Sequence, residues 1–314
     1  MADVGLRPQD ALHIVSVSLG SSRRNHSVHV EMLGKRLLIE RIGVDGDYHR
    51  ACALIAELDG RVAAIGLGGT DLYLVAGNRR YVVEQSRRLA ESAKVTPVVD
   101  GSGLKNTLER ETIRWLHASG ELRLEGRRVL LVCAVDRFGM AEALSEIECE
   151  TIFGDLIFGL GLQIPIRSLR TIRILAWLAL PFLRRLPIRL LYPTGEKQET
   201  AIPRYSRYFR WADVVAGDFH YIRRYMPQHG MERKAVITTT TTSDDVALLR
   251  DRGVSTLVTT TPEFEGRSFG TNVMEAALIA LAGKRPEEMG PNDYLEMLRQ
   301  LRWRPRIARL ATPA

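Results

Sequence analysis

The chain has 314 residues, of which 45% are hydrophobic and 26% are charged. This balance excludes a disordered chain and a small disulfide-stabilised scaffold, and a chain of this length usually forms two domains. The 44 lysines and arginines exceed the 37 acidic residues and give a net charge of +7, which favours anionic partners but does not specify a fold.

The sequence carries no signal for export, membrane insertion or metal binding. Its three cysteines form no CxxC pair, and the first residues lack a basic segment followed by a long apolar run. The apolar stretch at residues 174–183 is about half as long as a spanning helix requires. The histidines do not cluster at ligand spacing, so we expect no metal site. These features predict a cytoplasmic protein without a transmembrane segment.

Residues 1–120 alternate between strand-like and helix-like patterns. Such alternation is typical of an α/β domain with a largely parallel sheet. Strands are expected at residues 13–17, 28–33, 36–42, 62–67 and 96–99, a small hairpin at 72–83, and helices at 48–58, before residue 93 and at 106–117. The strands 28–33 and 36–42 flank Gly34 and Lys35 and predict a hairpin.

A polar, turn-rich bridge at residues 120–128 is the candidate domain boundary, and the pattern restarts after it. Strands are expected at residues 128–135, 150–153, 213–216, 235–237 and 256–258, and helices at 140–147 and 272–282. We therefore predict an α/β protein with two α/β domains, in which residues 121–314 form a Rossmann-like, doubly wound and mostly parallel sheet.

Residues 164–192 form a basic helical insertion with six arginines and no acidic residue, interleaved with leucines, isoleucines, Trp177 and Phe182. A helix that packs its apolar face on the sheet explains this composition, with the arginines at its rim. A phosphate or homo-oligomer contact and a peripheral membrane helix are alternatives. The six arginines account for most of the net charge of +7, so the charge is concentrated in one segment and a nucleic-acid partner is not expected.

The turn after strand 128–135 lies where a dinucleotide fold binds phosphate at a helix N-terminus. The glycine fingerprint is missing, because Ala134 and Asp136 occupy two of the three glycine positions and only Gly139 matches. Candidate cofactor contacts are nevertheless Asp136, Arg137, Phe138, Gly139 and, at later strand ends, Asp155 and Asp218. Asp136 also suits a helix cap, and an acidic residue at position 155 would contact a ribose and favour NAD.

Threonine-rich loops follow two successive strands at residues 238–242 and 259–262. Their hydroxyls and backbone donors predict cofactor contacts from Thr239, Thr240, Thr241 and Thr260, although threonine also ends strands and caps helices for purely structural reasons. In the loop 266–272, Arg267 is a candidate for charge pairing and Asn272 for orienting a carbonyl or amide. The alternative is a flexible connection with a helix cap.

Three polar loops follow strands of the first domain, at residues 16–25, 66–71 and 100–107. The last of them brings Lys105 close in sequence to Asp100. A lysine beside a carboxylate can act as a general acid or base once its surroundings adjust its pKa, and the same pair can equally form a structural salt bridge.

Taken together, these loops resemble a bacterial family labelled quinate or shikimate 5-dehydrogenase-like. The matching pieces are SVSLGSS, IGLGGTDLY, VVDGSGLKNTLERE, VDRFGMAEAL, IFGDLIFGLGL, AGDFHYIRRYMP and TTTPEFEGRSFGTNVMEA. The resemblance implies a substrate domain before an NAD(P)-binding domain, with the active site between them. It makes Lys105 and Asp100 or Asp71 candidates for proton transfer, and it implies that serines and other polar side chains hold substrate hydroxyls: Ser16, Ser18, Ser21, Ser102, Asn106 and Thr107.

The resulting hypothesis is an NAD(P)-dependent oxidoreductase that acts on a quinate-like or shikimate-like polyhydroxylated cyclic acid, with NAD or NADP as cofactor. The missing glycine fingerprint favours the alternative, a ligand-binding or regulatory protein that performs no redox step on a degenerate Rossmann scaffold. A homo-oligomer is compatible with both hypotheses.

Overall fold

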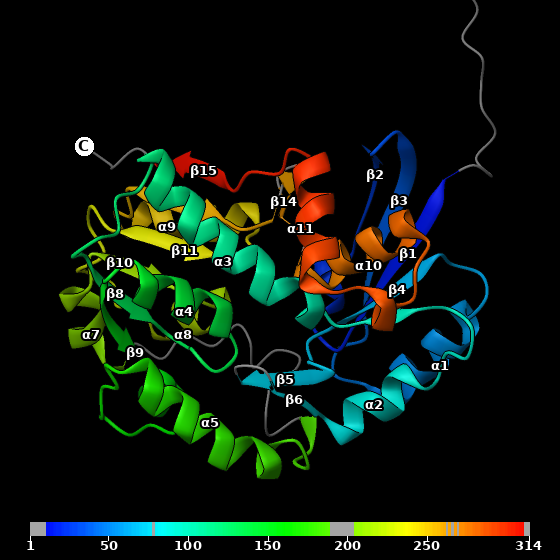
Figure 1. Cartoon of the computed structure of the whole chain (residues 1–314), viewed down its shortest axis with the longest axis horizontal. Helices are drawn as coiled ribbons and strands as arrows, with labels where there is room; N and C mark the ends of the chain where they lie inside the picture. Colours follow the sequence, from blue (N-terminus) through cyan, green and yellow to red (C-terminus); the bar gives the residue numbers. More distant parts are fainter. Residues whose placement is uncertain are drawn as a thin grey trace, which may run out of the picture.

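The computed structural model describes residues 11–76, 79–188, 204–261 and 270–310, together with the backbone of residues 263–264 and 267–268. The Arg267 side chain, Pro262 and residues 189–192 of the basic insertion lie outside this part. Figure 1 shows two α/β units side by side, with the N-terminal unit on the right of the view. The predicted α/β class is confirmed.

The first sheet has the strand order β2-β3-β1-β4-β7, and all but the edge strand β2 run parallel. The predicted hairpin is present: Met32 pairs with Lys35, and Leu33 and Gly34 form the turn with φ angles of 50° and 72°. Two left-handed residues in succession match the right-handed twist of a hairpin. The strands are β1 (Leu12–Ser18), β2 (His26–Met32), β3 (Lys35–Gly43), β4 (Ala64–Gly68) and β7 (Val98–Val99).

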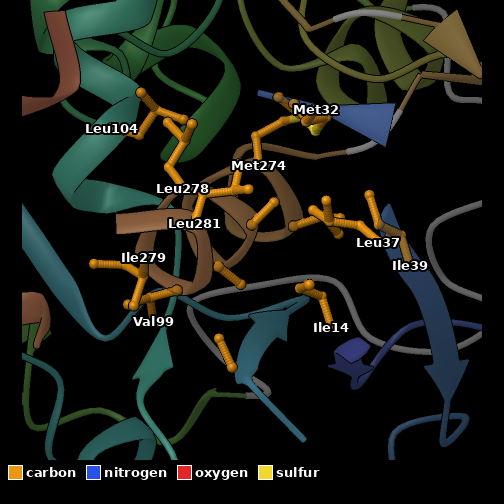
Figure 2. Close-up of a cluster of buried hydrophobic side chains, with 14 of the residues drawn as sticks. Ile14, Met32, Leu37, Ile39, Val99, Leu104, Met274, Leu278, Ile279 and Leu281 are labelled. Atoms are coloured by element: carbon orange, nitrogen blue, oxygen red, sulfur yellow. The ribbon is translucent and has the colours of Figure 1, made fainter. Parts of the chain in front are cut away.

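Helices cover both faces of this sheet. One face carries α1 (Tyr48–Leu58) and α2 (Glu84–Ala90), and the other carries α10 (Thr271–Ala282) and α11 (Pro291–Gln300). In Figure 2, Met274 and Leu278 of α10 pack with Leu104, Ile14 and Leu37. The sequence predicted helix 272–282 as part of the second domain, but its apolar surface is instead buried against the first sheet. After the parallel strands of the second sheet the chain thus returns to the first sheet with α10 and α11, and a single boundary at residue 120 does not describe this return.

The second sheet has the order β15-β12-β11-β10-β8-β9, parallel except for β15. The predicted doubly wound, mostly parallel sheet is confirmed, and its five parallel strands follow the order 2-1-3-4-5, which is the flavodoxin-like variant of this fold. Its strands are β8 (Arg128–Leu131), β9 (Glu150–Phe153), β10 (Val214–Ala216), β11 (Ala235–Thr238), β12 (Thr256–Thr259) and β15 (Arg306–Arg309). The predicted strand 128–135 ends at Leu131, so residues 132–137 are available as a loop.

Alternate residues of these strands face two separate cores, one shared with α4 (Phe138–Glu146) and the other with α7 (Ser206–Trp211), α8 (Phe219–Tyr225) and α9 (Ser243–Asp251). Helix α3 (Ser102–Ser119) joins the two domains: Leu104 and Leu108 lie in the core of the first, and Ile113 and Leu116 in that of the second. Both domains therefore fix the position of a side chain on α3.

The remaining elements are short or lie outside the sheets. They are the 3-10 helices Ser22–Arg24 and Pro286–Glu288, the π-helix Asp155–Gly159, α5 (Leu169–Leu183), and the hairpins β5 (Tyr73–Ala76) with β6 (Arg79–Val82) and β13 (Glu263–Phe264) with β14 (Arg267–Ser268). Across the described ranges, every helix is too short or too polar to traverse a bilayer.

Candidate functional site

A cavity of about 760 Å³ lies between the two sheets. Its walls come from the carboxyl ends of parallel strands in both domains: the loops after β1 and β4 on one side, and the loops after β8 and β10 on the other. Strands β8 and β10 are the neighbours at which the order of the second sheet reverses, and ligands of doubly wound folds bind at this switch point.

The cavity has an apolar wall and a polar wall. Leu175, Ala179 and Leu183 of α5 line it together with Val132 and Leu156. The charged and hydroxyl side chains of the lining, which form the polar wall, come from the first domain and from the loops of the second sheet. A mostly apolar pocket with a few convergent polar groups is typical of small-molecule sites.

Lys105 is part of the polar wall and contacts carboxylates of both domains. Its Nζ is 2.6 Å from Oδ1 of Asp136 and 3.5 Å from Oδ1 of Asp71, and its side chain is only 10% exposed. Burial alone would lower the pKa of Lys105, but the charges of Asp136 and Asp71 outweigh it and raise the pKa. Burial likewise opposes ionisation of Asp136, yet Lys105 and Arg137 hold its pKa at about 2. At neutral pH Lys105 is therefore an ammonium donor rather than a base.

The backbone around Gly101 explains why Lys105 points into the cavity. Gly101 has a φ of 96°, and α3 begins directly after it, four residues earlier than predicted. A Cβ at this position would lie 2.6 Å from the Asn272 nitrogen, so only glycine lets α10 approach so closely. Lys105 consequently lies in the first turn of α3, beside the ends of β4 and β8.

Asp100 was predicted to take part in proton transfer with Lys105, but its carboxylate binds backbone amides instead. Its carboxylate accepts hydrogen bonds from the amides of Leu72 at 2.5 Å, Tyr73 at 3.0 Å and Ser102 at 3.0 Å. These bonds hold the start of the β5–β6 hairpin and the N-terminus of α3. Asp100 lines the cavity, but Asp71 and Asp136 are the carboxylates that contact Lys105.

Arg137 is a buried link between the domains. Its guanidinium pairs with Glu109 of α3, donates to Thr239 Oγ1 at 2.7 Å and reaches Asp218 Oδ2 at 3.0 Å. Burial raises the pKa of Glu109, and the charge of Arg137 opposes that rise. Sequence reasoning missed Glu109, although its position four residues after Lys105 on the same helix was a usable signal.

A second polar group lies at the end of β1. Asn272 Nδ2 donates to Ser16 Oγ at 2.9 Å, and Arg41 Nη2 donates to Ser18 Oγ at 2.9 Å. These contacts bring together the predicted Ser16, Ser18 and Asn272. Arg41, which the prediction missed, comes from the strand adjacent to β1.

Arg24 and His220 also line the cavity and were not predicted. Arg24 Nη1 lies 3.1 Å from His220 Nε2, which connects the first domain to the loop after β10. Burial lowers the pKa of His220 despite the opposing charge of Asp218. A neutral His220 can accept from Arg24 at neutral pH. Arg24 lies in the polar loop 16–25, so the sequence offered a signal for it.

Other predicted residues do not reach the cavity. Phe138 lies in the hydrophobic core, and Asn106 Oδ1 accepts from the Gly139 amide at 3.0 Å, so that both contribute to the packing of α3 on α4. The predicted residues absent from its lining are Ser21, Ser102, Asn106, Thr107, Phe138, Gly139, Thr241 and Thr260. Among the predicted cofactor contacts, Asp155, Thr239 and Thr240 do line the cavity.

The turn after β8 does not fit a dinucleotide pyrophosphate in this arrangement. Asp155 accepts from the backbone amides of Ala134 at 3.1 Å and Val135 at 2.9 Å, and Asn106 occupies the Gly139 amide. The donors that would hold a phosphate are thus bound to the protein's own side chains. Burial raises the pKa of Asp155, against the effect of these two amides. Binding of NAD or NADP remains a prediction from the sequence.

Comparison with family models gives two adjacent matches. The model described as Domain of unknown function (DUF8753) matches residues 13–100, and that described as Domain of unknown function (DUF8754) matches residues 103–310. No curated protein sequence matches the chain.

Similar solved structures include proteins of several kinds. Hetero-hexameric glutamate dehydrogenase from Thermus thermophilus is 11% identical, with coverage of 94% of this chain and 70% of that one and a TM-score of 0.39. The 5-methylthioribose transporter solute binding protein from Thermotoga lettingae is 11% identical, with coverage of 97% and 88% and a TM-score of 0.40. The glucose-galactose binding protein GanP from Geobacillus stearothermophilus is 9% identical, with coverage of 95% and 97% and a TM-score of 0.37. Likeness at this level carries no inference about a ligand.

Proposed function

We propose that this chain, which belongs to the family described as Domain of unknown function (DUF8754), binds a small polyhydroxylated molecule between its two domains without a redox step. The observation that carries the proposal is the position of Lys105, held as an ammonium group between Asp71 of one domain and Asp136 of the other at the wall of the cavity.

The ligand class follows from the donors and acceptors on the polar wall. Carboxylates accept hydrogen bonds from hydroxyl groups, and Lys105 donates to their oxygens, so neighbouring hydroxyls satisfy both kinds of group. Arg24 and Arg41, which also line the cavity, suit a carboxylate on the ligand. The volume of about 760 Å³ lies within the usual range for small-molecule pockets.

The second candidate is an NAD(P)-dependent oxidoreductase for a quinate-like or shikimate-like acid. It is supported by the resemblance of the loops to that family and by the pairing of Lys105 with carboxylates, where the ammonium group would donate a proton to the reacting oxygen. The amides of the β8 turn, already bound by Asp155 and Asn106, argue against it.

Native mass spectrometry of the freshly purified full chain tests the proposal. We expect a retained metabolite, and we expect quinate, shikimate or a related polyol acid to raise the melting temperature. Lys105→Met should weaken this binding at least tenfold, whereas Lys94→Met, which removes an exposed lysine, should not. Lys105→Arg keeps the charge between the carboxylates and should fold but still bind more weakly.

Two results would overturn the proposal. Normal binding by a folded Lys105→Arg or Lys105→Met variant would show that Lys105 does not contribute to ligand binding. A fluorescence change on titration with NADH or NADPH at up to millimolar concentration would favour the oxidoreductase instead.

A further inference from the structure

Helix α5 forms a strap across the cavity from one domain to the other. In its first half Ile172 lies in the core of the second domain, and Arg173 pairs with Glu142 of α4. At its other end, the Glu84 amide of α2 donates to the Arg184 carbonyl at 3.1 Å. The Ile188 amide donates to Gln85 Oε1 at 2.8 Å, so the strap is attached to the first domain.

The outer face of α5 is apolar although it faces solvent. We define the α5 surface by Ile174, Trp177, Leu178 and Phe182, with Trp177 53% and Phe182 72% exposed. Eight of the ten exposed large hydrophobic side chains in the described part of the chain fall within residues 160–186. Figure 1 shows α5 at the lower edge of the molecule, which agrees with the exposure of these side chains among the residues that the structure describes. Scattered exposed leucines are ordinary, but such a concentration marks a contact surface.

Positive charge flanks the α5 surface at both ends. Arg170 and Arg173 precede it and Arg184 and Arg185 follow it, and residues 164–188 contain no acidic residue. Among the described side chains, no carboxylate pairs with Arg170 or Arg184, whereas Arg173 pairs with Glu142. An apolar face with aromatic side chains and flanking arginines matches the interface of a bilayer that carries anionic headgroups.

We propose that α5 docks the protein on an anionic bilayer, lying in the plane of the interface with Trp177 and Phe182 inserted and Arg170 and Arg184 at lipid phosphates. The helix has 15 residues, so it cannot span the membrane. A second copy of the chain is a poorer occupant, because a two-fold contact through this face would place arginines against arginines.

Flotation of the full chain with vesicles tests this docking. The chain should float with vesicles of phosphatidylcholine containing 30% phosphatidylglycerol and at least tenfold less with phosphatidylcholine alone, and salt should weaken the binding. Trp177→Ser with Phe182→Ser should reduce flotation at least tenfold, and Arg170→Glu with Arg184→Glu should do the same. These side chains are exposed or half-buried, so the variants should retain the wild-type melting temperature.

The matched control is Val95→Ser with Arg250→Glu, which removes an exposed apolar side chain and an exposed arginine from other parts of the surface and should float as the wild type does. Equal flotation of the α5 variants and this control would overturn the proposal, as would the absence of wild-type flotation. A lipid-free dimer that dissociates in the Trp177→Ser and Phe182→Ser variant would also overturn it, because a second copy would then cover the α5 surface. None of these results depends on a ligand in the cavity.

Discussion

Replacing Glu275 with glutamine should remove a pH-dependent loss of stability. Glu275 is buried in α10, where its Oε2 accepts from the Gly101 amide at 2.7 Å and its Oε1 accepts from the Tyr294 hydroxyl at 2.7 Å. Burial, helped by the charge of Asp100, raises the pKa of Glu275 from 4.5 to about 7 despite these two hydrogen bonds.

A carboxyl whose pKa is higher in the folded state binds a proton more tightly there. Its contribution to stability is complete below pH 4.5 and is lost as the pH rises through about 7. The difference between a pKa of 4.5 in the unfolded chain and about 7 in the folded one corresponds to about 3 kcal/mol in the free energy of unfolding. About 2 to 3 kcal/mol of this is lost between pH 5 and pH 8.

The assay is urea unfolding of the wild type and of Glu275→Gln at pH 5 and pH 8. Glutamine can accept from the Gly101 amide and donate to the Tyr294 oxygen, so it preserves the packing without a titrating group. Between these pH values the wild type should lose about 2 to 3 kcal/mol more than the variant. The comparison cancels the other buried carboxyls common to both proteins, so a parallel change in the two would refute the reasoning.

Three further substitutions test the packing around the cavity. Arg137→Met should lower the free energy of unfolding by about 3 to 5 kcal/mol, since it leaves Glu109 buried without its partner, and adding Glu109→Leu should recover most of the loss in denaturant titrations. Gly139→Ala places a Cβ 2.2 Å from a backbone oxygen of α3 and should cost about 1 to 3 kcal/mol in the same assay, whereas Gly159→Ala, with nothing within 4 Å, should cost far less. Asp100→Ala leaves three amides without their acceptor and should lower the melting temperature more than Asp100→Asn, which keeps one oxygen.

Local sequence patterns predicted an element correctly where the residues that start and end it lie within or next to the element itself. Helix 48–58 has Asp47 as a side-chain cap, and its observed bounds equal the predicted ones. Strand 150–153 is likewise observed over the predicted residues. Helix 272–282 was also predicted, but not the sheet on which it packs. Nine of its twelve residues are buried, so it has no polar face that indicates which core it covers.

The site was predicted as a set of loops rather than as a set of contacts. Lys105 was identified because it lies in a polar loop after a strand, and Asp71 was a candidate through the family resemblance; the structure brings the two together. The pairing of Lys105 with Asp136 depends on how the two domains meet, and no local pattern encodes that arrangement. The bonds of Asp100 to backbone amides were invisible for a related reason, because the sequence does not show which amides lack a partner.

The two proposals meet in α5, because its inner side chains Leu175 and Leu183 line the cavity while Trp177 and Phe182 face outward. Its ends are bound to different domains, so a ligand that changes the separation of the domains must also move the strap. Any effect of the ligand on membrane affinity must be matched by an equal effect of the membrane on ligand affinity, since coupling between two sites is reciprocal. Binding of the positively charged α5 region to a membrane would therefore change ligand affinity through movement of the strap. It would not do so through direct contact, because none of the five arginines at residues 167–185 lines the cavity.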